Sequence, residues 1–122
     1  MFFLRAGYMG SSRYTTAFWA GDQMVNFSRH DGLASVIPAA LSLGICGGAI
    51  HHSDIGGYTT LGWVKRRQET FQRWAEQAVF TPIMRTHEGN RPDFNHQFNS
   101  NQGTLSHLAR MTRLFVALKP YH

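Results

Sequence analysis

The sequence predicts an α/β fold in which parallel strands alternate with helices, as in part of a (β/α)8 TIM barrel. Two observations predict this fold. Short apolar runs alternate with helical patterns along the chain, and strands so spaced are joined by right-handed crossovers in a parallel arrangement. Polar side chains follow each apolar run, and barrel enzymes build their active sites at those strand ends, which favours a barrel over an open sheet.

Four short apolar runs are the expected strands. Each is followed within a few residues by Gly, Asp, Tyr or His, which is typical of a buried strand with a polar end. The four runs are Met1–Leu4, Ala17–Ala20, Ala49–His52 and Ile83–Thr86.

The first expected helix lies between the second and third runs. Asp31 is a candidate N-cap, Pro38 is expected to bend the helix early, and the Gly47-Gly48 pair is expected to end it. The residues of its apolar stripe are Leu33, Val36, Ile37, Ala40 and Leu41.

Two further helices are expected after the third and fourth runs. The stripe of the second helix steps by four, three, four and three residues, and its charged residues are expected to be largely solvated. This stripe comprises Val64, Gln68, Phe71, Ala75 and Ala78, and the solvated residues are Lys65, Arg66, Arg67 and Glu69. The last helix begins near Asn101 and Gly103 and ends before Pro120, with the stripe Leu105, Leu108, Thr112, Phe115 and Leu118.

The composition indicates one domain, residues 1–122, without a second domain. Its 43% hydrophobic residues could supply a core, and the charge of +5 suits nucleic acid, an anionic substrate or an uneven part of a larger protein. The single cysteine, Cys46, excludes an intrachain disulfide and favours a reducing, cytoplasmic location.

The most apolar run, residues 36–50, is interrupted by Pro38 and falls short of the about 20 residues that span a membrane, so we expect no membrane partner. Met1–Leu4 runs directly into Arg5 and lacks the features of a secretion signal.

Chemically capable side chains follow the four expected strands. Arg5 follows the first, Asp22 the second, the run His51–Asp54 the third, and Arg85 with His87 the fourth. A closed barrel would bring them into one pocket, where one carboxylate could ionise beside Arg5 while desolvation keeps another protonated. The pattern therefore permits separate acid and base roles.

Each candidate also has a purely structural interpretation. Asp22 could be a turn residue or helix N-cap, and Asp54 could be a turn residue before Gly56-Gly57, although two glycines also let a ligand approach the backbone. His51, His52, Asp54 and His87 suggest a zinc site, but adjacent strand residues point to opposite faces, so we expect no metal.

A basic nucleic-acid-binding module is a second class of function to consider. The run Lys65–Arg67 could contact phosphate, yet at a helix start it is expected to be a solvated face. Phe71 and Trp74 lie on or near the buried stripe and Phe18-Trp19 adjoins a strand, so no exposed stacking platform is evident. We therefore expect no nucleic-acid partner, and steep loss of binding with salt would be the sign of one.

At these same positions the sequence resembles glycoside hydrolase family 31, the α-glucosidase family, and most closely its bacterial sulfoquinovosidase-like members. The resemblance covers essentially the whole chain and implies the C-terminal half of the barrel, strands five to eight with their helices. The motifs are Phe3-Leu4-Arg5-Ala6-Gly7, Trp19-Ala20-Gly21-Asp22, His52-Ser53-Asp54-Ile55-Gly56-Gly57-Tyr58 and Arg85-Thr86-His87-Glu88-Gly89-Asn90-Arg91-Pro92.

The resemblance implies a retaining α-glycosidase that needs no cofactor. Asp22 matches the family's general acid/base, Arg5, Asp54 and His87 match residues that hold sugar hydroxyls, and Trp19 would line the pocket. The family's nucleophile is an aspartate on the fourth strand, and this sequence contains no match for it. The remainder of a parent barrel is therefore an expected partner, and an inactive truncated fragment is an alternative.

Tyr58 is the one local indication of substrate. Relatives acting on neutral glucosides often have Phe after the two glycines, whereas sulfoquinovosidase-like members have Tyr, whose hydroxyl helps to hold the sulfonate. Tyr58 therefore favours a sulfoquinovoside over an α-glucoside as the carbohydrate substrate. The structural alternative is that Tyr58 only packs beside the pocket.

Overall fold

The computed structural model describes residues 3–122 and contains a sheet of three parallel strands. The strands are β1 (Phe3–Leu4), β2 (Ala17–Trp19) and β3 (His51–His52), and they lie in the order β1-β2-β3. Leu4 pairs with Phe18, and Trp19 pairs with His52. The first three predicted strands are thus confirmed in part. β1 and β3 end as predicted at Leu4 and His52, β2 covers all of its predicted run except Ala20, and Met1 and Phe2 lie outside the described residues.

The predicted fourth strand, Ile83–Thr86, does not form a strand in the structure. Only one parallel bridge, between Ile55 and Thr86, represents it, with the Ile55 amide donating to the Arg85 carbonyl at 3.0 Å. The physical reason lies in the neighbouring segment: β3 ends at His52, and Gly56 and Gly57 have φ values of 88° and 75°, which turn the chain away. Residues 83–86 therefore lie beside the chain that follows β3, but they form only this one bridge and no continuous strand pairing.

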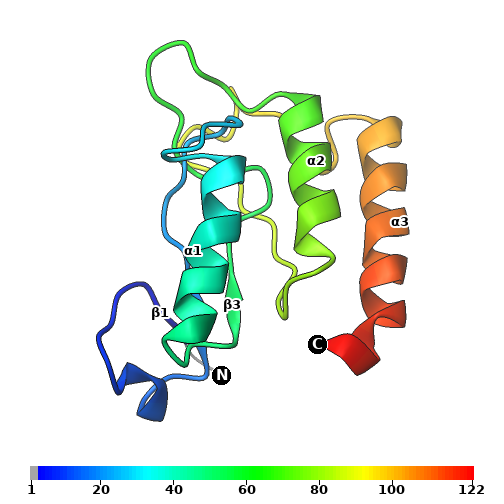
Figure 1. The fold of residues 1–122 in the computed structure, drawn as a ribbon. Coiled ribbons are helices and arrows are strands. Elements are labelled where there is room, and N and C mark those ends of the chain that lie inside the picture. Colours follow the sequence, from blue (N-terminus) through cyan, green and yellow to red (C-terminus); the bar gives the residue numbers. More distant parts are fainter. Residues whose placement is uncertain (1–2) are drawn as a thin grey trace.

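Three helices follow the strands, as expected. They are α1 (Leu33–Ile45), α2 (Gln68–Ala78) and α3 (Gln102–Ala117), and all three run in the same direction, with α2 beside α3 and α1 in front of β3 (Figure 1). Two short 3₁₀ helices, η1 (Ser11–Arg13) and η2 (Lys119–Tyr121), complete the order. This arrangement confirms the alternating α/β pattern.

The start of α1 differs from the prediction. Gly32, not Asp31, is the N-cap residue, and its amide donates to Ser35 Oγ at 3.1 Å while the Ser35 hydroxyl donates to the Gly32 carbonyl at 2.7 Å. Ser35 thus satisfies the helix end that Asp31 was expected to cap. In α3 the expected start is confirmed, because the Asn101 side chain accepts from the Thr104 amide at 2.8 Å.

Helix α2 supplies the centre of the hydrophobic core. Phe71, Trp74, Ala75 and Ala78 of this helix are buried. They pack in one cluster with Val36, Ile55, Val79 and Met111. Phe71, Ala75 and Ala78 of the stripe predicted for α2 are therefore confirmed as buried. Gln68, the first residue of the helix, is exposed, and Val64 precedes the helix and is 38% exposed.

The prediction that Arg66 is solvated is wrong. Its residue surface is 1% exposed, whereas Lys65 and Arg67 on either side are exposed. The reason is that residues 65–67 lie before α2 and not on it, so helical spacing does not govern their directions. Arg66 turns inward and hydrogen-bonds to the loops around it.

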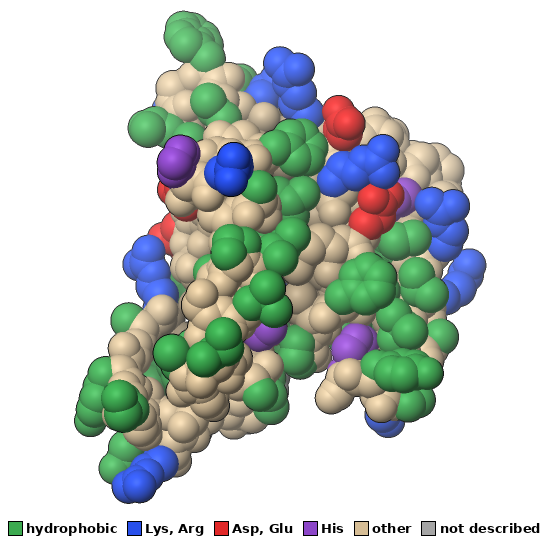
Figure 2. Space-filling view, in the orientation of Figure 1, with side chains coloured by type: hydrophobic (Ala, Val, Ile, Leu, Met, Phe, Trp, Pro, Cys, Tyr) green, Lys and Arg blue, Asp and Glu red, His purple; other side chains and the backbone are tan. Residues whose placement is uncertain are grey.

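Apolar side chains remain exposed along α1 and at the end of α2 (Figure 2). On α1, Ile37 is 48% and Leu41 is 67% exposed, although both belong to the predicted stripe, and Phe80 beyond α2 is 74% exposed. A cavity of about 860 Å³ lies between α1 and the sheet, lined mainly by apolar groups such as Phe18 and Leu43. Among residues 3–122, no helix combines the length and hydropathy needed to cross a membrane.

Candidate active site

The carboxyl ends of the strands bring Arg5 and Asp22 together. Arg5 follows β1, Asp22 lies three residues after β2, and Arg5 Nη2 is 3.3 Å from Asp22 Oδ2. Gly21 between β2 and Asp22 has φ 95°, and a Cβ there would lie 3.3 Å from Arg5 Nε, so a side chain would crowd the guanidinium. The Asp22 side chain is 32% exposed and so remains accessible to a ligand.

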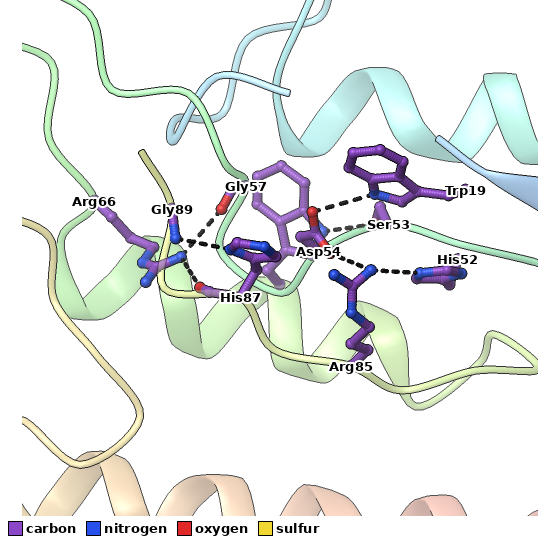
Figure 3. A network of polar contacts seen from close by, with 10 residues as sticks. Trp19, His52, Ser53, Asp54, Gly57, Arg66, Arg85, His87 and Gly89 are labelled. Carbon is purple, nitrogen blue, oxygen red and sulfur yellow. Dashed lines mark hydrogen bonds and ion pairs between the residues drawn. The ribbon is translucent and has the colours of Figure 1, made fainter. Parts of the chain in front are cut away.

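Trp19 joins this pair to Asp54. The indole Nε1 donates to Asp54 Oδ2 at 3.2 Å (Figure 3). The Arg5 guanidinium carbon lies 5.6 Å from the centroid of the indole ring. The Arg85 guanidinium is 6.0 Å from the same ring. Two guanidinium groups thus lie near the Trp19 ring, whose π face attracts cations.

Asp54 is enclosed by its partners. Its side chain is 1% exposed, and its Oδ1 forms an ion pair with Arg85 Nη1 at 3.1 Å. Burial raises the pKa of Asp54, and the charges of Arg85 and His87 and the hydrogen bond from Trp19 oppose that rise. The sequence interpretation of Asp54 as a direct sugar ligand requires Trp19 or Arg85 to move, because no surface is open to a hydroxyl.

His52 contacts the same guanidinium nitrogen of Arg85 as Asp54 does. Arg85 Nη1 donates to His52 Nε2 at 3.1 Å, which requires that nitrogen to be unprotonated. Burial, followed by the charges of Arg85 and His51, lowers the pKa of His52 to about 4. A neutral His52 with its proton on Nδ1 fits this contact.

Tyr58 and His87 form a second part of the site. Their rings meet edge to face with centroids 5.0 Å apart. His87 Nδ1 accepts from the Gly89 amide at 3.1 Å, which leaves the proton of a neutral ring on Nε2 (Figure 3). The Tyr58 backbone is also fixed, because its carbonyl accepts from the Asn90 amide at 3.2 Å.

The structure thus places four of the predicted site residues in direct contact with one another: Arg5, Trp19, Asp22 and Asp54. His87, whose ring contacts Tyr58, lies close enough for its charge to lower the pKa of Asp54. Within residues 3–122, no group of three or more His, Cys, Asp or Glu side chains is arranged to hold a metal ion. Chemically, the site offers one accessible carboxylate beside a guanidinium and aromatic rings. Such a carboxylate is suited to proton transfer with a bound ligand.

Sequence reasoning did not identify Arg66 or the link from His52 to Arg85. Arg85 was recognised as a residue at a strand end, but its contacts with His52 and Asp54 join segments 33 and 31 residues apart in the chain. The polar residue His52 inside an apolar run was a usable signal, since a buried imidazole needs a partner. No comparable signal marked Arg66.

Comparisons with known proteins extend this description. The family model described as "Glycosyl hydrolases family 31 TIM-barrel domain" matches residues 1–122 of this chain. The chain is 59% identical to a sulfoquinovosidase of Escherichia coli (strain K12) and 55% identical to one of Agrobacterium fabrum, covering 99% of this chain in both cases. A solved family 31 sulfoquinovosidase from E. rectale, in complex with an aza-sugar inhibitor, has a TM-score of 0.95 at 56% identity over 98% of this chain and 18% of the solved chain. The chain spans 18% of the length of the two curated relatives.

Proposed function

The chain belongs to glycosyl hydrolase family 31 as part of its TIM-barrel domain, and from this premise we propose that it contributes the acid/base half of a retaining α-glycosidase site for sulfoquinovosides. The observation that carries the proposal is the accessible Asp22 carboxylate, held 3.3 Å from Arg5 at the C-terminal edge of the parallel sheet. Active sites of TIM barrels lie at that edge.

Asp22 is the proposed general acid/base. In a retaining reaction it first protonates the leaving oxygen and then removes a proton from the water that attacks the covalent glycosyl-enzyme intermediate. The Arg5 side chain is 62% exposed, so water screens its ion pair with Asp22, and the proposed role of Arg5 is to orient the carboxylate.

The nucleophile is proposed to come from another part of the whole protein. Retaining enzymes place their two carboxyl groups about 5 Å apart. The other carboxylate of this site, Asp54, is enclosed by Trp19 and paired with Arg85, so it is poorly suited to attack a sugar. The rest of the catalytic barrel is therefore a proposed partner of this chain.

The remaining residues are proposed to bind the sugar. Trp19 lines the pocket, Arg5 and His87 bind hydroxyls, and Asp54 acts mainly by orienting Trp19 and Arg85. The Tyr58 hydroxyl is proposed to bind the sulfonate. The names of the E. coli and A. fabrum relatives support a sulfoquinovoside, and an α-glucoside is the second candidate because glucosidase II α subunit also resembles the chain, with a TM-score of 0.72 and 26% identity.

Nucleic-acid binding receives less support than sugar hydrolysis. The Lys and Arg side chains on the face in Figure 2 are scattered over several elements and do not form one patch. Burial of Arg66 removes one cation from the run of residues 65–67. We expect no salt-sensitive binding of DNA or RNA by this chain.

The proposal is tested in a complete enzyme in which this chain replaces the matching segment of the E. coli sulfoquinovosidase, here called the swapped enzyme. We expect it to hydrolyse an aryl α-sulfoquinovoside in preference to the aryl α-glucoside. Asp22→Asn should abolish turnover of alkyl sulfoquinovosides while sparing activated aryl substrates more, because a good leaving group needs less acid assistance. Equal loss on both substrates would remove Asp22 from the acid/base role.

Tyr58→Phe tests the substrate within the same enzyme. The change removes a hydroxyl and keeps the ring, so kcat/KM for the sulfoquinovoside should fall selectively relative to the glucoside. Unchanged discrimination would limit Tyr58 to packing.

A further inference from the structure

Arg66 is the most completely bonded polar side chain around the site. All five N–H groups of its guanidinium donate hydrogen bonds. Nε donates to the His96 carbonyl at 2.8 Å, Nη1 to the carbonyls of Gly57 and His87 at 3.0 and 2.8 Å, and Nη2 to the Glu88 carbonyl and Gln97 Oε1 at 3.2 and 2.8 Å. One side chain thus joins three loops.

The arrangement contains a buried cation without an ion pair. Four of its five acceptors are backbone carbonyls, and among the described residues no carboxylate lies within ion-pair distance of Arg66. Burial lowers the pKa of Arg66 to about 10 and Asp54 opposes that change. Burying a charge costs free energy, and an apolar side chain could fill the same space without that cost. The buried guanidinium therefore indicates a role for its hydrogen bonds.

The acceptors of Arg66 belong to the residues next to Tyr58 and His87. Its Nη1 donates to the Gly57 carbonyl, directly before Tyr58, and to the carbonyl of His87 itself (Figure 3). A single nitrogen therefore bridges the two chain segments that carry the Tyr58 and His87 rings, whose centroids are 5.0 Å apart. A lysine has its donors on one nitrogen and cannot reach the same set of carbonyls.

Two neighbouring features are shaped to admit Arg66. Gly56 has φ 88°, and a Cβ at this residue would collide with Arg66 Cδ, so the glycine provides the path of the side chain. Asn95 Oδ1 accepts from the Arg66 amide at 2.9 Å and from Thr60 Oγ1 at 2.7 Å, which anchors the backbone of Arg66 to the same loops. Both features are distant from Asp22 in the sequence.

We propose that Arg66 is a positioning residue for substrate specificity, which sets the spacing of Tyr58 and His87 by holding their two loops together. The proposal rests on the proposed function. Arg66 makes no hydrogen bond or ion pair with Asp22, Arg5 or Trp19, so it acts on sugar binding and not on proton transfer. Weakening the hydrogen bonds of Arg66 to these loops should therefore raise KM more than it lowers kcat.

The test compares Arg66→Lys and Arg66→Ala with the matched control Arg67→Ala in the swapped enzyme, since Arg67 is an exposed guanidinium one residue away. For Arg66→Lys we expect KM for an aryl α-sulfoquinovoside to rise about tenfold while kcat changes less than about threefold. Millimolar guanidinium ion should restore part of the lost affinity in Arg66→Ala, because it can occupy the vacated donor site. Arg67→Ala should match the parent with and without guanidinium.

Several results would overturn the proposal. They are unchanged KM in folded Arg66 variants, loss confined to kcat, equal guanidinium effects on the Arg67→Ala control, or failure of both Arg66 variants to fold, which would assign Arg66 to stability alone. An inactive parent swapped enzyme would instead overturn the proposed function.

Discussion

His52 and Arg85 show how one protonation state organises the site. Arg85 Nη1 contacts both His52 Nε2 and Asp54 Oδ1, each at 3.1 Å. A protonated His52 would offer a donor to a donor and place a second cation beside Arg85. Neutral His52 therefore permits Arg85 to face Asp54, which in turn accepts from Trp19.

The lowered pKa of His52 predicts a loss of stability in acid. The folded value of about 4 lies below the ordinary 6.5, so the unfolded chain takes up the proton first as the pH falls. The stabilisation is fully present above about pH 6.5 and is lost between pH 6.5 and 4, to a total of about 3 kcal/mol. Asp54 opposes this trend, because its raised pKa favours the protonated form in the folded state.

His52→Gln in the swapped enzyme isolates this effect, since glutamine retains an acceptor for Arg85 but does not titrate. Urea unfolding at pH 7 and pH 5 should show a smaller loss of unfolding free energy in the variant than in the parent. The same pH slope in both proteins would contradict the assigned state of His52.

At the residue scale, the sequence was sufficient for side chains that directly follow a strand. Asp22 and Arg5 follow adjacent strands, so their meeting at one edge was predictable from the parallel order alone. The position of Asp54 was predictable, but its enclosure was not, because that depends on the Trp19 rotamer and on Arg85 arriving from 31 residues along the chain.

Among the elements, α2 links the core to the site. Trp74 of α2 is 0% exposed, and its Nε1 donates to Ser53 Oγ at 2.9 Å, directly beside Asp54. The helix thereby fixes the position where the chain leaves β3. Helical spacing identified Phe71, Ala75 and Ala78 of this buried face correctly, whereas Gln68 of the predicted stripe is exposed.

Trp74→Phe is predicted to lower the unfolding free energy of the swapped enzyme by about 1–3 kcal/mol, because it leaves Ser53 Oγ buried without its donor and a gap beside the ring. The matched control is Trp63→Phe, since Trp63 is 95% exposed, and its effect should stay within about 0.5 kcal/mol. Denaturant unfolding measures both. Similar values for the two variants would contradict the role given to the Trp74 hydrogen bond.

Two elements could not be predicted fully, for different reasons. Strand pairing of residues 83–86 depends on how far the chain after β3 stays extended. The positive φ values of Gly56 and Gly57 turn that chain away early. The stripe of α1 was correctly apolar, but Ile37 and Leu41 are exposed because nothing among residues 3–122 covers them. Hydrophobic pattern indicates which face needs burial and does not indicate what buries it.

For the molecule as a whole, the 122-residue chain by itself is predicted to lack a cooperative fold. The outer strands of its three-stranded sheet have open backbone edges, and large apolar residues such as Leu41 and Phe80 are 67% and 74% exposed. Calorimetry should show no sharp transition, and amide NMR signals should be poorly dispersed. A sharp transition with dispersed signals would contradict this prediction, and the swapped enzyme serves as the folded control.

The central claim, that Asp22 is the acid/base of a retaining site, is tested most directly by the product that its Asn variant forms with azide. Azide needs no general base, so it can attack the covalent intermediate of Asp22→Asn swapped enzyme when water cannot. With an activated aryl α-sulfoquinovoside, we predict faster turnover with added azide and an α-configured glycosyl azide identified by NMR. A β-configured azide would make Asp22 the nucleophile, and the absence of any azide product would exclude it from the acid/base role.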